Sequence, residues 1–262
     1  MSVRILFIGD IVGSPGRSAI SRELHRLVDR HAVDLVIANG ENAAGGFGIT
    51  PDTAEELFRQ GICLLTSGNH IWDKKDTSGF LDREERIIRP LNYPPGTPGR
   101  GAALVETPGG ITVGVLNLEG RVYMKNLDCP FRTADAELAR LKKITPIVLV
   151  DIHAEATSEK SALGWYLDGR VSAVVGTHTH VQTADERILP GGTAYLTDVG
   201  MTGSFDSVIG IDKHQAIQRF LTQQPVKFDV PKKDLRINAV VIGVETATGK
   251  AVSIERINVP VG

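Results

Sequence analysis

Short, almost continuous apolar runs that end in polar residues recur along this chain. Such runs are typical of strands that are buried on both faces of a parallel sheet. The first three strands are predicted at Val3–Gly9, Asp34–Gly40 and Ile62–Thr66. Apolar residues at helical spacing predict a helix after each of the first two strands, beginning at Ser14 and at Thr50. This alternation predicts an α/β fold with a parallel sheet and helical crossovers.

The rest of the chain continues with the same two patterns. The further predicted elements are strands at Ile147–Ile152, Ala173–Gly176 and Thr193–Thr197, helices at Asp135–Lys143, Ser158–Leu167 and Asp212–Thr222, and hairpins that join Ala102–Glu106 to Ile111–Leu118 and Ile237–Glu245 to Ala251–Ile257. No break in composition marks a linker, so we expect a single domain over residues 1–262.

Polar residues that can bind metals stand at or just past the ends of several predicted strands. They comprise two carboxylates, two amides and three imidazoles: Asp10, Glu41, Asn42, Asn69, His153, His178 and His180. In parallel sheets, functional groups gather beyond the carboxyl ends of the strands. Oxygen and imidazole ligands without cysteine favour Fe, Mn²⁺ or Zn²⁺. Seven groups exceed the needs of one tetrahedral ion, and a carboxylate such as Glu41 can bridge two ions about 3.5–4 Å apart. We therefore predict two divalent or mixed-valence metal ions.

His70 directly follows Asn69, so a metal bound by Asn69 would hold this imidazole within reach of a substrate. An imidazole in that position can act as a general acid, which typically contributes about 10²–10⁴-fold to the rate. His70 could instead be an eighth ligand. We favour the general acid because seven ligands are already present.

Each of these residues, taken singly, has a simpler interpretation. Asp10 could be a turn or cap residue, and Asn69 could cap a helix. His153 could be a hydrogen-bonded core histidine, while His178 and His180 could line an ordinary exposed strand end. Their shared position at strand ends favours the metal site over these alternatives.

The glycine-rich segment Gly9–Gly16 suggests dinucleotide binding as another alternative. Its spacing does not match G-x-G-x-x-G, and no acidic residue ends the second strand in the usual place. We therefore reject this interpretation.

Composition narrows the class of protein but does not define its activity. The 262 residues are 42% hydrophobic and 23% charged, as in ordinary globular proteins. The net charge of −2 gives no signal for binding to nucleic acid or to an anionic membrane. The two cysteines do not suggest a disulfide framework, and Cys63 is expected to be a buried free thiol. Without a signal peptide or a membrane-spanning run, we expect a cytoplasmic protein.

The order of the motifs resembles the calcineurin-like metallophosphoesterase superfamily. The matching motifs are Gly9-Asp10, Gly40-Glu41-Asn42, Gly68-Asn69-His70, His153 and Gly176-Thr177-His178-Thr179-His180. Three positions depart from the superfamily pattern: Val12 replaces a histidine, Glu41 replaces the bridging aspartate, and Ile71 replaces an acid. With the segments Asn39–Gly46 and Asp151–Lys160, these departures resemble the YmdB-like branch, over essentially the whole chain.

The resemblance implies a four-layer α/β/β/α sandwich of the metallophosphoesterase type with a dinuclear centre. The first ion would be held by Asp10, Glu41, Asn42 and His180, and the second by Asn69, His153 and His178, with Glu41 as the bridge. Because Val12 leaves the first ion without its usual histidine, Asn42 is the candidate to fill that position. The resemblance also favours self-association as a homo-oligomer.

The YmdB-like branch consists of 2′,3′-cyclic-nucleotide 2′-phosphodiesterases, so a small cyclic-nucleotide or phosphoester substrate is expected. In the implied mechanism a metal-bridging hydroxide, available near pH 7, attacks phosphorus. His70 then protonates the 2′-oxygen, which leaves a 3′-nucleotide. Phe47 and Trp72 lie in loops near the expected site and could stack on the base or pack in the core or a lid.

Two alternative functions stay open at this point. The enzyme could be a phosphatase or phosphodiesterase for another substrate, such as RNA ends or a cyclic dinucleotide. A regulatory protein that uses the metal centre to bind a nucleotide without hydrolysing it is the alternative from a different class.

Overall fold

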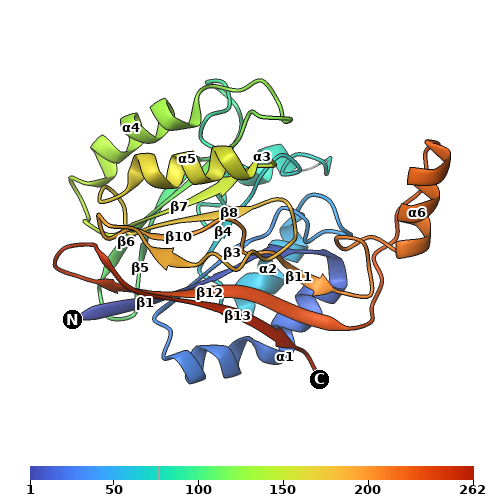
Figure 1. The fold of residues 1–262 in the computed structure, drawn as a ribbon, viewed down its shortest axis with the longest axis horizontal. Helices are drawn as coiled ribbons and strands as arrows, with labels where there is room; N and C mark the ends of the chain where they lie inside the picture. Colours follow the sequence, from blue (N-terminus) through green and yellow to red (C-terminus); the bar gives the residue numbers. More distant parts are fainter. Residues whose placement is uncertain (76) are drawn as a thin grey trace.

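Two β-sheets packed face to face form the centre of the molecule, and helices cover the outer face of each sheet (Figure 1). The computed structural model describes residues 1–75 and 77–262. The first sheet has the order β2 (Asp10–Ile11), β11 (Met201–Ser204), β12 (Leu235–Glu245), β1 (Ser2–Ile8), β3 (Leu35–Asn39) and β4 (Leu64–Thr66), with β13 (Ala251–Pro260) also paired with β12. The second has the order β5 (Ala102–Glu106), β6 (Thr112–Glu119), β7 (Val148–His153), β8 (Ala173–Thr177), β10 (Ala194–Leu196) and β9 (Arg187–Ile188).

Helices on the outer faces of the two sheets complete the expected four layers. The helices of the described residues are α1 (Gly13–His31), α2 (Pro51–Arg59), α3 (Thr77–Leu81), α4 (Pro130–Leu141), α5 (Thr157–Leu167) and α6 (Lys213–Thr222). Helices α1 and α2 pack against the first sheet, and α4 and α5 pack against the second. In Figure 1, α4 and α5 lie above the sheets and α1 lies below them. The predicted α/β/β/α sandwich is confirmed.

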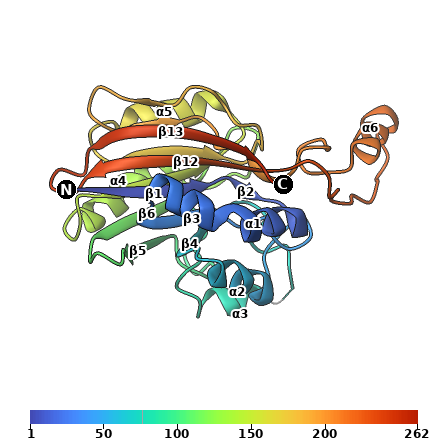
Figure 2. The ribbon, with the colours of Figure 1, turned by 90° about the horizontal axis from the view of Figure 1, so that it is seen from below.

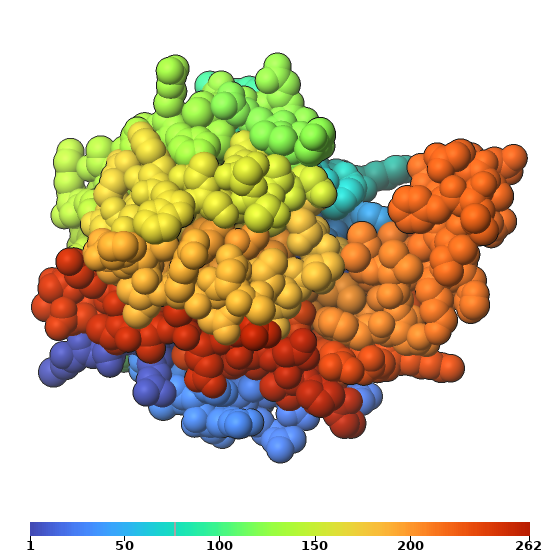
Figure 3. Space-filling view, viewed as in Figure 1, coloured from blue at the N-terminus to red at the C-terminus, as the bar shows by residue number. Residues whose placement is uncertain are grey.

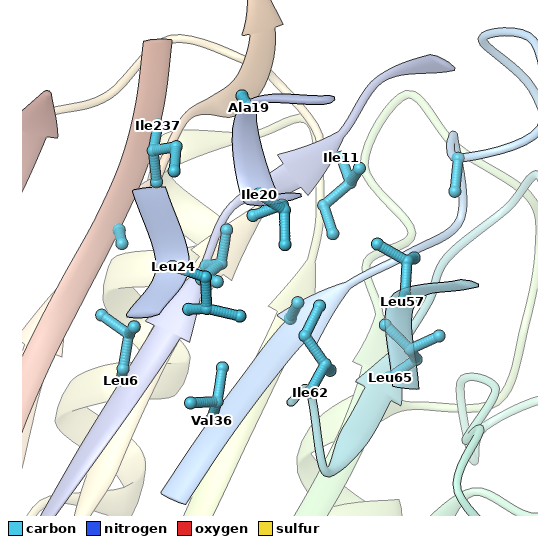
Figure 4. Packing of buried hydrophobic residues seen from close by; sticks show 14 of the residues in the cluster. Leu6, Ile11, Ala19, Ile20, Leu24, Val36, Leu57, Ile62, Leu65 and Ile237 are labelled. Atoms are coloured by element: carbon cyan, nitrogen blue, oxygen red, sulfur yellow. The ribbon is translucent and has the colours of Figure 1, made fainter. Parts of the chain in front are cut away.

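Alternating residues of the strands divide the apolar core into three parts, one for each space between layers. In β1, Leu6 and Ile8 pack under α1 with Ile20 and Leu24 (Figure 4). Phe7 points the other way, into the space between the two sheets. Burying one such side chain completely stabilises the fold by roughly 1.5–3 kcal/mol relative to leaving it exposed. Packing in these three parts of the core therefore holds the two sheets together, with their strand ends next to each other.

Strand directions match the expected crossovers but make both sheets mixed. Strands β1, β3 and β4 run parallel in register, as the alternation of strand and helix predicted. Strands β6, β7, β8 and β10 are also parallel. The two predicted hairpins are present as β5–β6 and β12–β13, and β12 adds an antiparallel neighbour to β1. The parallel strands place their carboxyl ends at one edge of the molecule.

Several predicted boundaries were wrong for local reasons. Helix α4 begins at Pro130 rather than at Asp135, because a proline in the first turn has the backbone angle that a helix needs. Helix α1 begins at Gly13 rather than at Ser14, with no side-chain cap from Val12. The short parallel pair of β2 and β11 was missed, because two and four residues show no readable period.

Helix α6 stands apart from the four layers (Figures 1 and 2, orange). Its side chains include Phe220 and Leu221, which are 74% and 80% exposed. The segments before and after this helix return to the body of the protein and border the site described below.

Both cysteines are free, as expected. Cys63 is partly rather than fully buried, and it lies just before β4 rather than within it. Among the described residues, no helix combines the length and apolar character that crossing a membrane requires.

Candidate metal centre

All seven residues predicted as ligands meet where the strands of both sheets end. Asp10 begins β2, Glu41 and Asn42 follow β3, Asn69 follows β4, His153 ends β7, and His178 and His180 follow β8. The two sheets thus contribute to one site, because their parallel strands end on the same side. The chain separations of up to 170 residues make this a product of the fold and not of local sequence.

The imidazole of His153 is the hub of the site. Its Nε2 atom lies 3.0 Å from Glu41 Oε1, 3.0 Å from Asn69 Oδ1 and 3.0 Å from His178 Nδ1. An imidazole nitrogen carries one proton or one lone pair, so it cannot form hydrogen bonds with all three atoms. Glu41, His153 and His178 also form a group whose ligand atoms lie within 4.8 Å of one another. A cation between these atoms would satisfy all of them.

The hydroxyl of Thr177 determines which nitrogen of His153 is free to bind a metal. Thr177 Oγ1 donates its one proton to Asp151 Oδ1 at 2.8 Å, so it must accept from His153 Nδ1, 2.9 Å away. We therefore assign the proton of a neutral His153 to Nδ1. Nε2 then presents its lone pair to the other donor atoms, as in a metal-ligating histidine held by an outer partner.

Gly68 lets the loop after β4 approach His153 closely. A Cβ atom at Gly68 would lie 2.1 Å from Cδ2 and 2.3 Å from Nε2 of His153, which is closer than atoms can approach. Any side chain there would push Asn69 away from the imidazole. The glycine that ends this strand is therefore a requirement of the site.

We call this first group of donors the tight half. It consists of Glu41, Asn69, His153 and His178. The remaining donors, which we call the open half, are Asp10, Asn42 and His180.

Donor atoms of the open half are farther apart and less satisfied. His180 Nε2 lies 3.9 Å from Asp10 Oδ1 and 3.2 Å from Asn42 Nδ2. Asp10 Oδ1 and Asn42 Oδ1 are buried and have no hydrogen-bond partner among the described residues. A half-turn of the Asn42 carboxamide would bring its oxygen to face His180. Leaving buried oxygens unpaired is costly, and a second cation would satisfy both.

Val12 occupies the position of the histidine that the superfamily pattern predicts. Its side chain is 2% exposed and packs against Gly203 and Gly210. It therefore contributes an apolar wall and no donor atom. That Asn42 takes the place of the missing ligand stays a prediction.

Buried charges hold the loop that carries two of the histidines. His178 and His180 have φ angles of 100° and 65°, in the left-handed region that costs a non-glycine residue about 1–3 kcal/mol. Between them, Thr179 donates through its backbone N–H and its hydroxyl to Asp198 Oδ2, at 3.2 and 2.7 Å. Asp198 is in turn paired with Lys160 at 2.6 Å, and both side chains are 1% exposed. This support was not predicted from the sequence.

The pKa values show how strongly the metal-free site attracts a positive charge. Burial would raise the pKa of Glu41, but the charge and hydrogen bond of His153 outweigh it and lower that pKa to about 2. Burial opposes protonation of His153, yet Glu41 raises its pKa to about 9. Burial and the charge of His153 lower the pKa of His178 to about 3. Burial also raises the pKa of Asp10. The proton that His153 holds in its ion pair with Glu41 therefore supplies the positive charge that a cation would bring.

His70 lies beside this donor set, and its ring contacts Asp73 and Phe47. Its backbone N–H donates to Glu41 Oε2 at 3.1 Å, and its Nδ1 lies 2.7 Å from Asp73 Oδ2. The ring is 30% exposed and meets the edge of Phe47, with centroids 5.1 Å apart. Sequence reasoning missed Asp73, since it expected an acid directly after His70 and found Ile71. The only signal in the sequence for this contact is that Asp73 follows His70 by three residues, which is within the reach of one turn.

A pocket of about 250 Å³ opens over the donor atoms. Its lining includes Glu41 and His178 together with Phe47 and Phe228. Trp72 is not part of this lining. It packs against the core and against Tyr93, with ring centroids 4.6 Å apart, so it takes the core-packing alternative.

The sequence matches the YmdB-like protein family over residues 6–257. The chain belongs to this family. A 2′,3′-cyclic-nucleotide 2′-phosphodiesterase from Bacillus subtilis (strain 168) is 51% identical over 255 residues, which cover 97% of this chain and 96% of that protein. The resemblance to YmdB-like proteins is therefore confirmed.

Two solved structures that match nearly the whole chain share the same fold. A hypothetical protein from Thermus thermophilus has a TM-score of 0.91 at 45% identity and covers 99% of this chain and 100% of its own. A novel phosphatase from Mycoplasma pneumoniae has a TM-score of 0.93 at 34% identity and covers 99% of this chain and 94% of its own.

Proposed function

We propose that this protein is a metal-dependent phosphodiesterase that hydrolyses 2′,3′-cyclic nucleotides to 3′-nucleotides. The observation that carries the proposal is the single nitrogen of His153 facing three acceptor atoms at 3.0 Å, a set that a metal ion satisfies. The 51% identity to a named 2′,3′-cyclic-nucleotide 2′-phosphodiesterase supports the substrate class.

Two ions are assigned to the seven donors. The tight half would hold one, the open half would hold the other, and Glu41 would belong to both, because its Oε1 lies 3.0 Å from His153 and 3.2 Å from Asn42. When bound, such ions stabilise charge on phosphoryl oxygens and lower the pKa of coordinated water. The mixed oxygen and imidazole donors fit Mn²⁺ or Fe, and also Zn²⁺.

His70 is assigned as the general acid. Its Nδ1 is engaged by Asp73, which leaves Nε2 for the pocket. In the proposed reaction, water adds across the bond between phosphorus and the 2′-oxygen. The hydroxyl remains on phosphorus, His70 delivers a proton to the departing 2′-oxygen, and the other proton of the water restores the proton of His70.

The walls of the pocket fit a nucleoside. Phe47 and Phe228 line the pocket and provide aromatic surface on which a base can stack, while Glu41 and His178 of the same lining belong to the proposed metal centre, where the phosphate would bind. An apolar wall with a few polar groups at one end is typical of small-molecule sites.

The test separates metal binding from proton transfer. His70→Ala should lower kcat on 2′,3′-cyclic AMP by about 10²–10⁴-fold and leave the metal content unchanged, whereas Asn69→Ala should lose metal. His25→Ala, on the exposed face of α1, removes an imidazole outside the site and serves as the control. Chromatography should identify 3′-AMP as the product. If the protein with both ions bound hydrolyses no phosphoester, the proposal is wrong, and if His70→Ala loses metal, His70 is a ligand instead.

A further inference from the structure

A second cleft, of about 800 Å³, lies between the loop before β5 and the start of α4. Figure 1 shows these segments, in teal and green, at the top of the molecule, and the space-filling view in Figure 3 shows the green segments along the same edge. Arg121 and Arg132 border the cleft, are exposed and form no ion pair with any described residue. Arg140 also borders it but is paired with Glu137. Asp128 is the remaining acid of the described lining, so the cleft is positive.

Arg89 adds a buried charge to this cleft. The residue is 8% exposed, and its guanidinium donates to the backbone oxygens of Pro90, Leu91 and Thr97 at 2.8–3.2 Å. Its Nε atom has no partner and its charge no carboxylate partner among the described residues. Burial lowers the pKa of this group, as expected for a cation without a counter-ion. Such a charge favours an anion in the space beside it.

The first turn of α4 points to the same kind of ligand. Cys129, Arg132 and Thr133 of this turn border the cleft. No acidic residue lies in the turn, and no side chain caps it. The unpaired N–H groups at a helix N-terminus attract phosphate and other anions. The N-terminus of α4 and the buried guanidinium of Arg89 therefore each favour a negatively charged ligand, independently of one another.

Lys125 connects the cleft to the metal centre. Its Nζ donates to the backbone oxygen of Asn69 at 3.4 Å and to the hydroxyl of Tyr93 at 3.2 Å. Tyr93 borders the cleft, and Asn69 is a donor of the tight half. Lys125 therefore lies between a residue of the tight half and a residue of the arginine-lined cleft.

We propose that this cleft binds the phosphodiester backbone of an oligoribonucleotide whose 3′ end carries the 2′,3′-cyclic phosphate. The proposal rests on the proposed function and extends its substrate class from mononucleotides to RNA ends. A 2′,3′-cyclic phosphate uses both hydroxyls of one ribose, so in a chain it can occur only at the 3′ end. The rest of the chain then leaves through the 5′-oxygen and carries one negative charge per nucleotide, which matches the charge of the cleft.

The chemistry at the metal centre is the same for both substrates. Water adds across the bond between phosphorus and the 2′-oxygen, the proton goes to that oxygen, and the product is a chain with a 3′-phosphate and a free 2′-hydroxyl. Binding in the cleft should therefore lower KM without changing the reaction.

The experiment compares 2′,3′-cyclic AMP with a pentaadenylate that ends in a 2′,3′-cyclic phosphate. In the unmodified protein, KM should be about tenfold lower for the pentaadenylate. The double variant Arg121→Ala/Arg132→Ala should remove most of this advantage and leave kcat/KM for cyclic AMP within about twofold. The slope of log KM against log salt for the pentaadenylate should fall by about 0.7 for each phosphate that the variant no longer neutralises.

A matched control removes two arginines from elsewhere on the surface. Arg26→Ala/Arg59→Ala makes the same change in charge on α1 and α2, where the side chains are 79% and 74% exposed, and should leave both substrates unchanged. Equal effects of the Arg121/Arg132 variant on both substrates, or none on either, would overturn the proposal. Binding of a 3′-phosphorylated pentaadenylate, followed by fluorescence anisotropy, tests the cleft apart from catalysis. If no substrate is hydrolysed but this binding depends on Arg121 and Arg132, the proposed function fails and the cleft stands; if the variant binds as well as the unmodified protein, the cleft proposal fails.

Discussion

The tight half and the open half of the proposed metal centre differ in how far their donors are preorganised. In the tight half, three donor atoms lie 3.0 Å from one nitrogen of a completely buried histidine. In the open half, the corresponding approach of Asp10 Oδ1 to His180 Nε2 is 3.9 Å, and two buried oxygens lack partners among the described residues. A site that already holds its donors at ligand spacing loses less entropy when the ion binds.

The residues behind each half explain the difference. His153 is backed by Thr177 and Asp151, both completely buried within adjacent strands. The Nδ1 atom of His180 lies 2.8 Å from the carbonyl oxygen of Ile209. Ile209 belongs to a loop, and it is 48% exposed. Strand-backed ligands move less than ligands backed by a surface loop. We therefore expect the ion of the tight half to bind first and to leave last.

The largest expected effect comes from removing the hub of the tight half. His153→Ala should lose both ions, because Glu41 is then left without the partner that fixes it. If the ions contribute about 4 kcal/mol to stabilising the transition state, kcat/KM should fall about 10³-fold. His180→Ala should instead retain about one ion per chain. Metal analysis after dialysis, together with hydrolysis of 2′,3′-cyclic AMP, checks both expectations.

The two variants also test the order of binding. If His180→Ala loses both ions while His153→Ala retains one, the open half is the stronger site and the comparison is reversed. Circular dichroism must show that each variant is folded, since removing a buried imidazole also leaves a cavity. His25→Ala on the exposed surface of α1 provides the control for loss of an imidazole.

Sequence reasoning could predict that the seven candidate ligands lie together because they share one simple property. Each of them stands at or next to the end of an apolar strand, and parallel strands end at a common edge, so the convergence of Glu41, Asn69 and His153 could be predicted without coordinates. The α/β class could be predicted from the same apolar runs, such as Val3–Gly9, whose residues alternate between two buried faces. The arrangement in four layers was expected only from the resemblance to the metallophosphoesterase superfamily.

The support for the ligands could not be predicted in this way. Asp151 lies inside an apolar strand and Thr177 is the last residue of another, and neither has a pattern that predicts a contact with His153. Only the register of β7 against β8 brings the hydroxyl of Thr177 to His153. Asp73 reaches His70 across a turn, and Lys160 reaches Asp198 from a different element. The distinction between the halves depends on distances that differ by about an ångström, and a sequence pattern does not encode these.

A smaller effect is expected from the hydroxyl behind the tight half. Thr177→Val keeps nearly the same shape but removes the link between His153 Nδ1 and Asp151. Loss of such an outer partner typically costs about 10–100-fold in metal affinity. Competition with a fluorescent chelator should show this loss for the tightly bound ion. Thr177→Ser retains a hydroxyl and should restore most of the affinity, so equal weakening by both variants would indicate a packing effect instead.

The smallest effect concerns pH. In the metal-free protein, the pKa of His153 is raised to about 9, so its pairing with Glu41 contributes stability that is complete below about pH 6.5 and is lost as the pH rises through 9. The pKa of Glu41 is lowered to about 2, so its contribution is present above about pH 4.5 and is lost as the pH falls toward 2. Within this pair, the metal-free site is therefore most stable between about pH 4.5 and 6.5.

Metal binding must displace the proton that this pair holds, so the ion should stabilise the protein more at high pH. The increase in Tm produced by Mn²⁺ should be larger at pH 8.5 than at pH 5.5, as measured by thermal unfolding with and without the ion. His180→Ala, which leaves the tight half intact, should keep this pH dependence although it binds fewer ions. A Tm gain that is independent of pH in both proteins would show that the proton shared by Glu41 and His153 does not compete with the metal, and the tight half would then owe its affinity to the other donors.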